Sequence, residues 1–174
     1  MKIFIFSNKK FLYFSVFLII ALLMAHDMKT RLMINHTPSL PGLLYSITPI
    51  KENTELKRND IVRICPDKNI TKVALILHVT LKSKTCPFGT EPLIKKIMAV
   101  PGDYIKATGE QEIEINNEKI PGTKPRVRIP HYIFEGIVPE NNYLVLTNHP
   151  DGFDSRYFGL IDKRYFTDKA YKIF

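Results

Sequence analysis

Residues 91–103, EPLIKKIMAVPGD, place two adjacent lysines inside an apolar run that ends in Pro-Gly-Asp. Successive side chains of a β-strand point to opposite faces. On a strand, one face would carry Leu93, Lys95, Ile97 and Ala99, and the other would carry Ile94, Lys96, Met98 and Val100. Both faces are mostly apolar, so the pattern predicts that at least one of the two lysines enters an apolar environment.

Other short apolar runs surround this stretch, and they favour β structure. DIVRICP (60–66), KVALILHVTL (72–81) and YLVLTN (143–148) are typical of strands, the second of a buried one. EIEINNEKIPG (112–122) alternates and carries Asn-Asn as a hairpin turn. Beyond residue 31 no long apolar stripe has the period of a helix, so few helices are expected. The sequence predicts one mainly β, mostly antiparallel domain.

The composition fits a folded domain, because the 174 residues are 45% hydrophobic and 24% charged. The net charge of +8 would suit nucleic acid, an anionic membrane surface or a solvated basic face. The basic residues are spread along the chain, without zinc-finger spacing, a helix-turn-helix pattern or an aromatic-basic motif. We therefore expect no nucleic-acid partner.

The N-terminal stretch FLYFSVFLIIALLMA has no charged residue from Phe11 to Ala25. As a helix it spans roughly 22 Å, short against a hydrocarbon core of about 30 Å, although flanking residues can compensate. A cleaved secretory signal has the same apolar length. A cut after Ala25 would place Leu23 at the third position before the cut, where a small side chain is needed. The uncleaved anchor is therefore favoured.

An anchor at this place divides the chain into three parts. Residues 1–10 would form a cytoplasmic N-terminus, residues 11–27 a transmembrane anchor in the lipid bilayer, and residues 28–174 a domain outside the cytoplasm. Three lysines precede the apolar segment and favour this orientation, against a nearly equal number of basic residues just after it.

Two cysteines, Cys65 and Cys86, are separated by 21 positions. In an exported domain such a pair can oxidise, and closing a loop of this size would stabilise the fold by roughly 3 kcal/mol. Two free thiols are the alternative. No C-x-x-C motif or His/Cys cluster indicates a metal site, so we expect neither a metal nor another cofactor.

Ser39 is a candidate nucleophile, because Pro38 and Pro41 stiffen the segment that presents it. A surface serine in a turn is the alternative interpretation. A serine needs a base, and His149, five residues before Asp154, could suggest a Ser-His-Asp arrangement. However, neither His149 nor the other candidate bases, His36, His78 and His131, lies in a distinctive motif.

A lysine is the other known base for a serine nucleophile. An exposed lysine is protonated at neutral pH, but burial disfavours the charged form and lowers the pKa by up to several units. The apolar stretch around Lys95 and Lys96 is a suitable setting, unless both side chains reach solvent from the strand.

LIKKIMAVPGD (93–103) resembles the lysine-bearing box of bacterial type I signal peptidases, and VPENNYLVLTNHPDGFDSRYFG (138–159) is similar to their later box. The segment around Ser39 matches the serine-bearing box of this family in its order along the chain and in its position close behind the hydrophobic segment. The resemblance runs roughly from Asn35 to the C-terminus. The N-x-T-x-S pattern before Pro-Gly, and the cysteine pair ahead of the lysine box, resemble the conjugative-transfer, TraF-like branch.

The resemblance implies a role for each matching residue. Ser39 corresponds to the nucleophile and Lys95 to the general base, whereas Lys96 matches a variable basic neighbour. Thr37 corresponds to a hydroxyl that helps the Ser39 backbone N–H to hold the oxyanion, and Asp154 and Arg156 would support the site.

One position departs from the family pattern. Many members have a serine that hydrogen-bonds the catalytic lysine two residues before the aspartate of the later box, and here that position is Gly152. Thr147, a water molecule or a backbone carbonyl would then have to orient Lys95.

The resemblance implies a signal-peptidase-like β domain with one N-terminal transmembrane helix, in the bacterial inner membrane with its catalytic domain on the periplasmic side. Its activity would be that of a Ser-Lys serine endopeptidase that cleaves preproteins, such as a pilin precursor or another conjugation or type IV secretion component. Cleavage by hydrolysis and by transpeptidation both remain open. The alternative is a weak or inactive membrane-tethered β module that assists a secretion machine.

Overall fold

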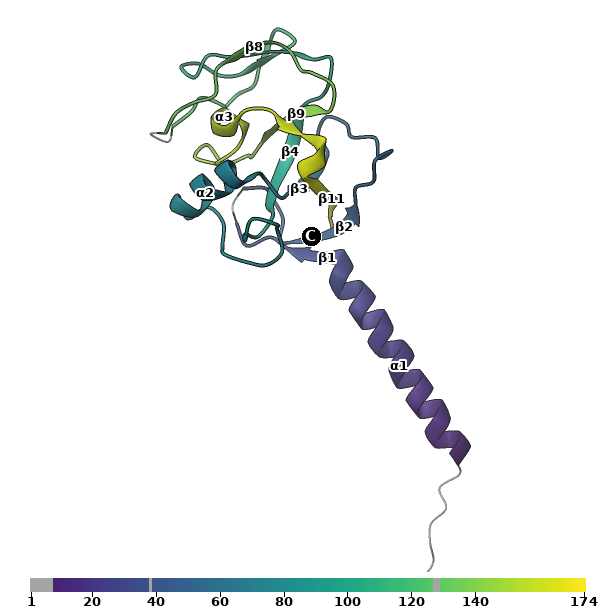
Figure 1. The fold of residues 1–174 in the computed structure, drawn as a ribbon. Helices are drawn as coiled ribbons and strands as arrows, with labels where there is room; N and C mark the ends of the chain where they lie inside the picture. The colour runs from purple at the N-terminus through teal and green to yellow at the C-terminus, as the bar shows by residue number, and fades with distance from the viewer. Residues whose placement is uncertain (1–7, 38, 127–128) are drawn as a thin grey trace, which may run out of the picture.

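The computed structural model describes residues 8–37, 39–126 and 129–174, and it consists of a long N-terminal helix and a domain of two β-sheets (Figure 1). The helices are α1 Asn8–Arg31, α2 Lys68–Ile76, α3 Ser155–Phe158 and the 3-10 helix η1 Lys163–Tyr165. The strands are β1 Leu32–Ile34, β2 Leu44–Pro49, β3 Ile61–Ile64, β4 Leu93–Ala99, β5 Tyr104–Ala107, β6 Glu114–Ile115, β7 Glu118–Lys119, β8 Phe134–Ile137, β9 Asn142–Leu146, β10 Ile161–Asp162 and β11 Phe166–Lys172.

The larger sheet has the strand order β1-β2-β11-β3-β4-β9-β10, and the smaller sheet has the order β7-β6-β5-β8. Every strand pair within the described residues is antiparallel. The predicted mainly β, antiparallel fold is therefore confirmed. The hairpin predicted over residues 112–122 is also confirmed, since Asn116 and Asn117 have φ of 51° and 68° between β6 and β7, as a two-residue hairpin turn requires.

Strand β4 carries the two lysines and lies between β3 and β9. Its apolar side chains Leu93, Ile94, Ile97 and Ala99 each join a different one of the four apolar clusters among the described residues. Lys95 is 4% exposed, whereas Lys96 is only partly buried. The prediction that at least one lysine enters an apolar environment is confirmed.

The strand predicted over residues 72–81 is wrong, because the first half of this segment belongs to helix α2. Asp67 caps the helix, and its side chain accepts hydrogen bonds from the backbone N–H groups of Asn69 and Ile70, at 2.7 and 2.9 Å. The helix buries Thr71 and Ala74, three positions apart on one face. A continuous apolar run does not distinguish a strand from a short helix by its periodicity.

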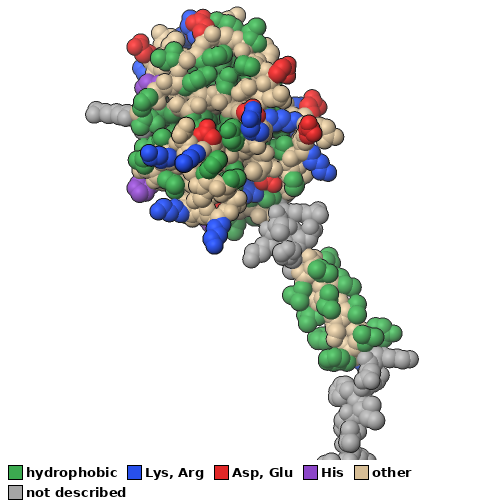
Figure 2. Space-filling model, in the orientation of Figure 1, with side chains coloured by type: hydrophobic (Ala, Val, Ile, Leu, Met, Phe, Trp, Pro, Cys, Tyr) green, Lys and Arg blue, Asp and Glu red, His purple; other side chains and the backbone are tan. Residues whose placement is uncertain are grey.

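Helix α1 extends away from the domain (Figure 1), and its described apolar side chains are exposed, for example Phe17 at 68%. Figure 2 shows apolar side chains along the described middle of this helix. Among the residues that the structure describes, no helix combines the length and the hydropathy that a membrane crossing needs. The structure thus shows a helix where residues 11–27 were expected to be an anchor, but it does not support the membrane crossing itself. The expected cytoplasmic segment 1–10 lies mostly outside the described residues.

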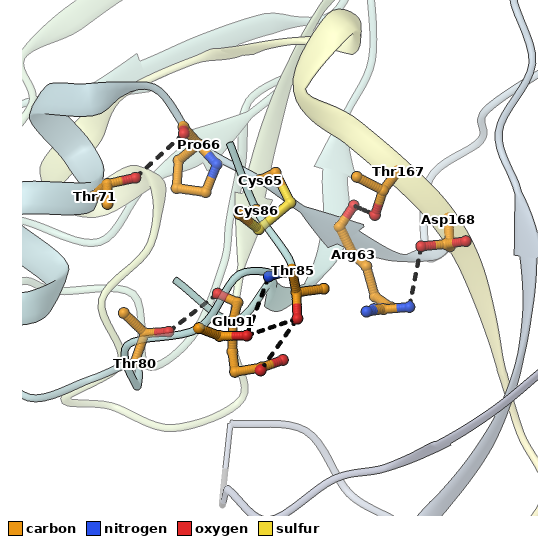
Figure 3. The surroundings of a disulfide bond; sticks show 11 residues. Arg63, Cys65, Pro66, Thr71, Thr80, Thr85, Cys86, Glu91, Thr167 and Asp168 are labelled. Carbon is orange, nitrogen blue, oxygen red and sulfur yellow. Dashed lines mark hydrogen bonds and ion pairs between the residues drawn. A yellow bond between two sulfur atoms is a disulfide. The ribbon is translucent and has the colours of Figure 1, made fainter. Parts of the chain in front are cut away.

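The disulfide between Cys65 and Cys86 is formed (Figure 3). Cys65 directly follows β3, and Cys86 lies in the segment 77–92 between α2 and β4, which we call the disulfide loop. The loop is closed on itself by backbone hydrogen bonds from Ser83 N to Gly89 O and from Cys86 N to Thr90 O, at 3.0 and 2.9 Å. The disulfide therefore fastens a self-contained loop to the central sheet.

We predict that reduction of this disulfide lowers the thermal midpoint of unfolding. A cross-link that closes a loop of this size stabilises the fold by roughly 3 kcal/mol, because it restricts the unfolded chain. Differential scanning fluorimetry with and without reductant measures the shift. The variant Cys65→Ala/Cys86→Ala should have the lower midpoint in both conditions. An equal midpoint for the oxidised and reduced wild type would contradict the prediction.

Candidate active site

The side chain of Asn35 organises the segment that presents Ser39. Its amide nitrogen donates to the carbonyl oxygens of Leu40 and Gly42, at 2.9 and 3.1 Å, and its Oδ1 accepts from the N–H and the hydroxyl of Thr37. Asn35 is itself buried, so these four bonds fill its hydrogen-bonding capacity. One amide group therefore links the residues before and after Ser39 into a fixed loop.

Two further contacts join this serine loop, of which residues 35–37 and 39–42 are described, to the body of the domain. The carbonyl oxygen of Ser39 accepts a hydrogen bond from the N–H of Asn148, at 2.9 Å. Gly42 has φ of +114°, and a Cβ there would lie 2.8 Å from Cε of Lys172. Only glycine combines this backbone conformation with so close an approach. The half-buried Ser39 is thus held from both sides.

Lys95 projects from β4 into an apolar environment, and among the described residues its Nζ has no hydrogen-bond or ion-pair partner. Burial lowers the pKa of Lys95 from the ordinary 10.5 to about 8, because the charged form loses its solvation. The charge of Asp154 raises this pKa, and the charge of Arg156 lowers it. A lysine with a pKa near 8 is neutral in about a tenth of the molecules at pH 7 and can then accept a proton.

Ser39 and Lys95 line the same cavity of about 230 Å³, together with Thr37, His78 and Gly152. A second cavity of about 370 Å³ also has Ser39 and Lys95 in its wall and extends along β1 and the disulfide loop. The Ser39 hydroxyl and Lys95 Nζ do not hydrogen-bond each other in this structure, nor does either bond another described group. In this structure the two side chains are therefore related by the cavity walls that they share and not by a bond to each other.

Thr37 lines the same cavities as the candidate nucleophile Ser39, but its hydroxyl proton is in use. The hydroxyl donates to Asn35 Oδ1 at 3.0 Å, since an amide oxygen can only accept. A hydroxyl has one proton, so Thr37 has to release Asn35 before it can donate to an oxyanion.

Asp154 and Arg156 form a buried ion pair near Lys95, with exposures of 0% and 2%. Nε of Arg156 donates to Oδ1 of Asp154 at 2.7 Å, and Nη2 donates to Oδ2 at 2.6 Å. The guanidinium also donates to the carbonyl oxygens of His149, Pro150 and Gly152. The pair therefore fixes the course of the segment 149–152, which forms part of the wall of the smaller cavity.

Thr147, the proposed support for Lys95, bonds to the ion pair instead. Its hydroxyl lies 3.1 Å from Oδ2 of Asp154 and accepts from Nη2 of Arg156 at 3.2 Å. A Cβ added at Gly152 would lie 1.8 Å from this hydroxyl oxygen. Thr147 therefore occupies the space that a side chain at position 152 would need.

The sequence did not show how two residues of the site, Asn35 and His78, are placed. Asn35 belongs to the quoted motif, but an asparagine four residues before a serine gives no sign that its side chain bonds around the loop. His78 has φ of +55° just after α2 and reaches both cavities, whereas the sequence interpretation put it on a strand. The candidates His36 and His149 each line one of the cavities, while the ring of His131 lies tilted against that of Tyr157, with centroids 5.9 Å apart.

Comparison with known proteins points to the same family over nearly all of the chain. The family model described as signal peptidase, peptidase S26, matches residues 7–174. The conjugal transfer protein TraF of Agrobacterium fabrum is 28% identical over 131 residues, which cover 74% of this chain and 73% of that protein. The probable conjugal transfer protein TraF of Sinorhizobium fredii is 30% identical over 133 residues, covering 74% and 69%.

Among solved structures, a signal peptidase I from Enterococcus faecalis matches with a TM-score of 0.38 and 18% identity, over 65% of this chain and 94% of that one.

We predict that Lys95→Met raises the thermal midpoint at pH 7. The folded state lowers the pKa of Lys95, so between about pH 8 and 10.5 the unfolded chain binds the extra proton, and stability rises with pH across that window. Below it, the buried charge costs on the order of 3 kcal/mol, which methionine avoids. The gain should shrink towards pH 10.5, and Lys96→Met is the matched control. A gain that is absent at pH 7, or that does not change with pH, would contradict the burial of this charge.

We predict that Asn35→Ala loosens the serine loop while the sheets stay folded, because it removes four hydrogen bonds worth about 1 kcal/mol each. Hydrogen exchange followed by mass spectrometry should show faster exchange in the peptide covering residues 35–43. The exposed Asn53→Ala variant is the control. Unchanged protection of this peptide in Asn35→Ala would show that the loop does not depend on the amide.

Proposed function

The chain belongs to the signal peptidase family, peptidase S26, and on that premise we propose that it is a serine endopeptidase with Ser39 as nucleophile and Lys95 as general base. One observation carries the proposal. Lys95 is the buried amine that lines a cavity with Ser39, and it lacks a hydrogen-bond or ion-pair partner among the described residues. Structural buried charges are paired as a rule, whereas a base has to be free to receive a proton.

The reaction follows from these two groups. Neutral Lys95 takes the proton of the Ser39 hydroxyl, and Oγ attacks the peptide carbonyl to give a tetrahedral intermediate. Lys95 then passes the proton to the amine, the C–N bond breaks and the amine leaves the acyl-enzyme, from which a water molecule activated by Lys95 releases the acyl group. For the oxyanion we propose the N–H of Ser39 and, once it has turned away from Asn35, the hydroxyl of Thr37. Such donors are typically worth about 3–4 kcal/mol each.

The substrates we propose are exported preproteins with small side chains at the first and third positions before the cut. Relatives of this chain carry the name conjugal transfer protein, so a pilin precursor or another component of the conjugation or type IV secretion machinery is the substrate to test first. An amine in place of water would give transpeptidation at the same acyl-enzyme, which the mass of the product distinguishes.

We further propose that α1 anchors the chain in the inner membrane, with the β domain on the periplasmic side. Two observations support this location. The described side chains of α1 from Phe11 to Met24 are apolar except for Ser15, and nearly all of them are exposed. The disulfide between Cys65 and Cys86 suits an oxidising compartment. An anchor would hold enzyme and membrane-bound preprotein in one plane.

We predict that Ser39→Ala and Lys95→Ala abolish cleavage of a co-expressed pilin-like preprotein, whereas Lys96→Ala retains much of it. Because the base has to be neutral, the rate should rise with pH up to about pH 8. Gel shift and mass spectrometry measure the cleavage. Cleavage by Ser39→Ala and by Lys95→Ala at the wild-type rate would refute the catalytic assignment. If the wild type also failed on a panel of such preproteins, a tethered module that assists secretion without cleaving would be favoured.

A further inference from the structure

Gly152 is the point where the wall of the catalytic cavity lacks a side chain. It lines the smaller cavity together with Ser39 and Lys95. A Cβ at this position would lie 1.8 Å from Oγ1 of Thr147, 3.0 Å from its Cβ and 3.1 Å from Nη2 of Arg156. These contacts, and not an unusual φ, exclude a larger residue here.

The Thr147 hydroxyl cannot move aside without a loss. It has the carboxylate of Asp154 and the carbonyl of His149 as acceptors, at 3.1 and 3.2 Å, and it accepts from Arg156. Its backbone N–H donates to the same Oδ2 of Asp154 at 2.8 Å. The side chain is β-branched and rotates only between a few χ1 positions, so a turn large enough to admit a Cβ at Gly152 would break these bonds.

The ion pair that Thr147 contacts acts on Lys95 through its charges. The carboxylate of Asp154 favours the protonated lysine, and the guanidinium of Arg156 favours the neutral one. A small displacement of either group would change the balance. The other titratable groups in the walls of the two cavities are His36, His78, Glu91, His149 and Asp151.

We propose that Thr147 and Gly152 form one steric unit, in which the threonine hydroxyl fills the place of a side chain at position 152 and holds the Asp154–Arg156 pair in position behind Lys95. Thr147 is then a positioning residue, and it can occupy this place only because residue 152 is a glycine and has no side chain. The inference rests on the proposed peptidase function only where activity is the readout, because the steric part concerns the fold alone.

The steric part is tested by a double-mutant cycle on the full chain with the thermal midpoint as readout. Gly152→Ala should lower the midpoint clearly in the wild-type background and much less in the Thr147→Ala background, because the second variant removes the hydroxyl that the new Cβ meets. Contacting residues give non-additive effects of this kind. Additive effects, or a Gly152→Ala variant as stable as the wild type, would overturn the proposal.

The positioning part is tested with Thr147→Val, which keeps the shape and removes the hydroxyl, and Thr147→Ser, which keeps the hydroxyl. The probe is a fluorogenic peptide with alanine at the first and third positions before the scissile bond. We expect kcat to fall roughly 10- to 100-fold in the valine variant with little change in KM, and the serine variant to recover most of it. Thr108→Val is the matched control, since the buried Thr108 hydroxyl has no partner among the described residues.

The pH profile separates positioning from a merely structural role. Without the Thr147 hydroxyl, Asp154 loses a hydrogen-bond donor and its charge acts more strongly on Lys95, so the rising limb of kcat should move to higher pH. A valine variant with wild-type kcat and an unmoved limb would refute the positioning role. If the wild type did not cleave the peptide at all, the proposed function would fail, while the stability cycle would still decide the steric unit.

Discussion

The burial of one amine, that of Lys95, is the main energetic constraint on the central sheet. Burying a charge costs several kcal/mol in real proteins, so the strand that carries it has to be stabilised from all sides. Strand β4 fulfils this condition, because it pairs with β3 and β9 and sends one side chain into each of the four apolar clusters. Burial of Lys95 lowers the stability of the folded state, and it also lowers the pKa of the amine, which can therefore be neutral near pH 8. Such a loss of stability is the usual cost of a functional site, and it agrees with the proposed role of Lys95 as a base.

The buried pair of Asp154 and Arg156 shows how the domain balances that charge. A carboxylate alone near Lys95 would raise the pKa of the lysine, and a guanidinium alone would lower it further. Bonded to each other by two short contacts, they leave burial as the largest influence on Lys95. Buried ion pairs add little net stability. The many backbone carbonyls that Arg156 binds indicate that this pair instead serves to fix the loop between β9 and α3.

The central strand and the hairpin could be predicted from the sequence because both depend on local rules. These are the alternation of side chains in β4 and the left-handed backbone conformation that asparagine tolerates at residues 116–117. The burial of Lys95 could also be predicted, since its neighbours are apolar in the chain itself. Helix α2 could not, because its apolar run fits either structure and only tertiary packing of Thr71 and Ala74 decides. Thr147 was considered for Lys95 but bonds to Asp154, seven residues away along the chain, and such a contact exists only after α3 has folded back.

Thr147 and its neighbour Asn148 connect the two halves of the site. The proposed nucleophile, Ser39, comes from the loop before β2 and the proposed base, Lys95, from β4, and among the described residues the two groups share no hydrogen bond. Asn148 donates from its backbone to the carbonyl of Ser39, and Thr147 bonds to the ion pair beside Lys95. Adjacent residues in one extended chain are separated by a fixed distance of about 3.8 Å. The segment that directly follows β9 therefore contacts the Ser39 loop and also the ion pair whose charges act on Lys95.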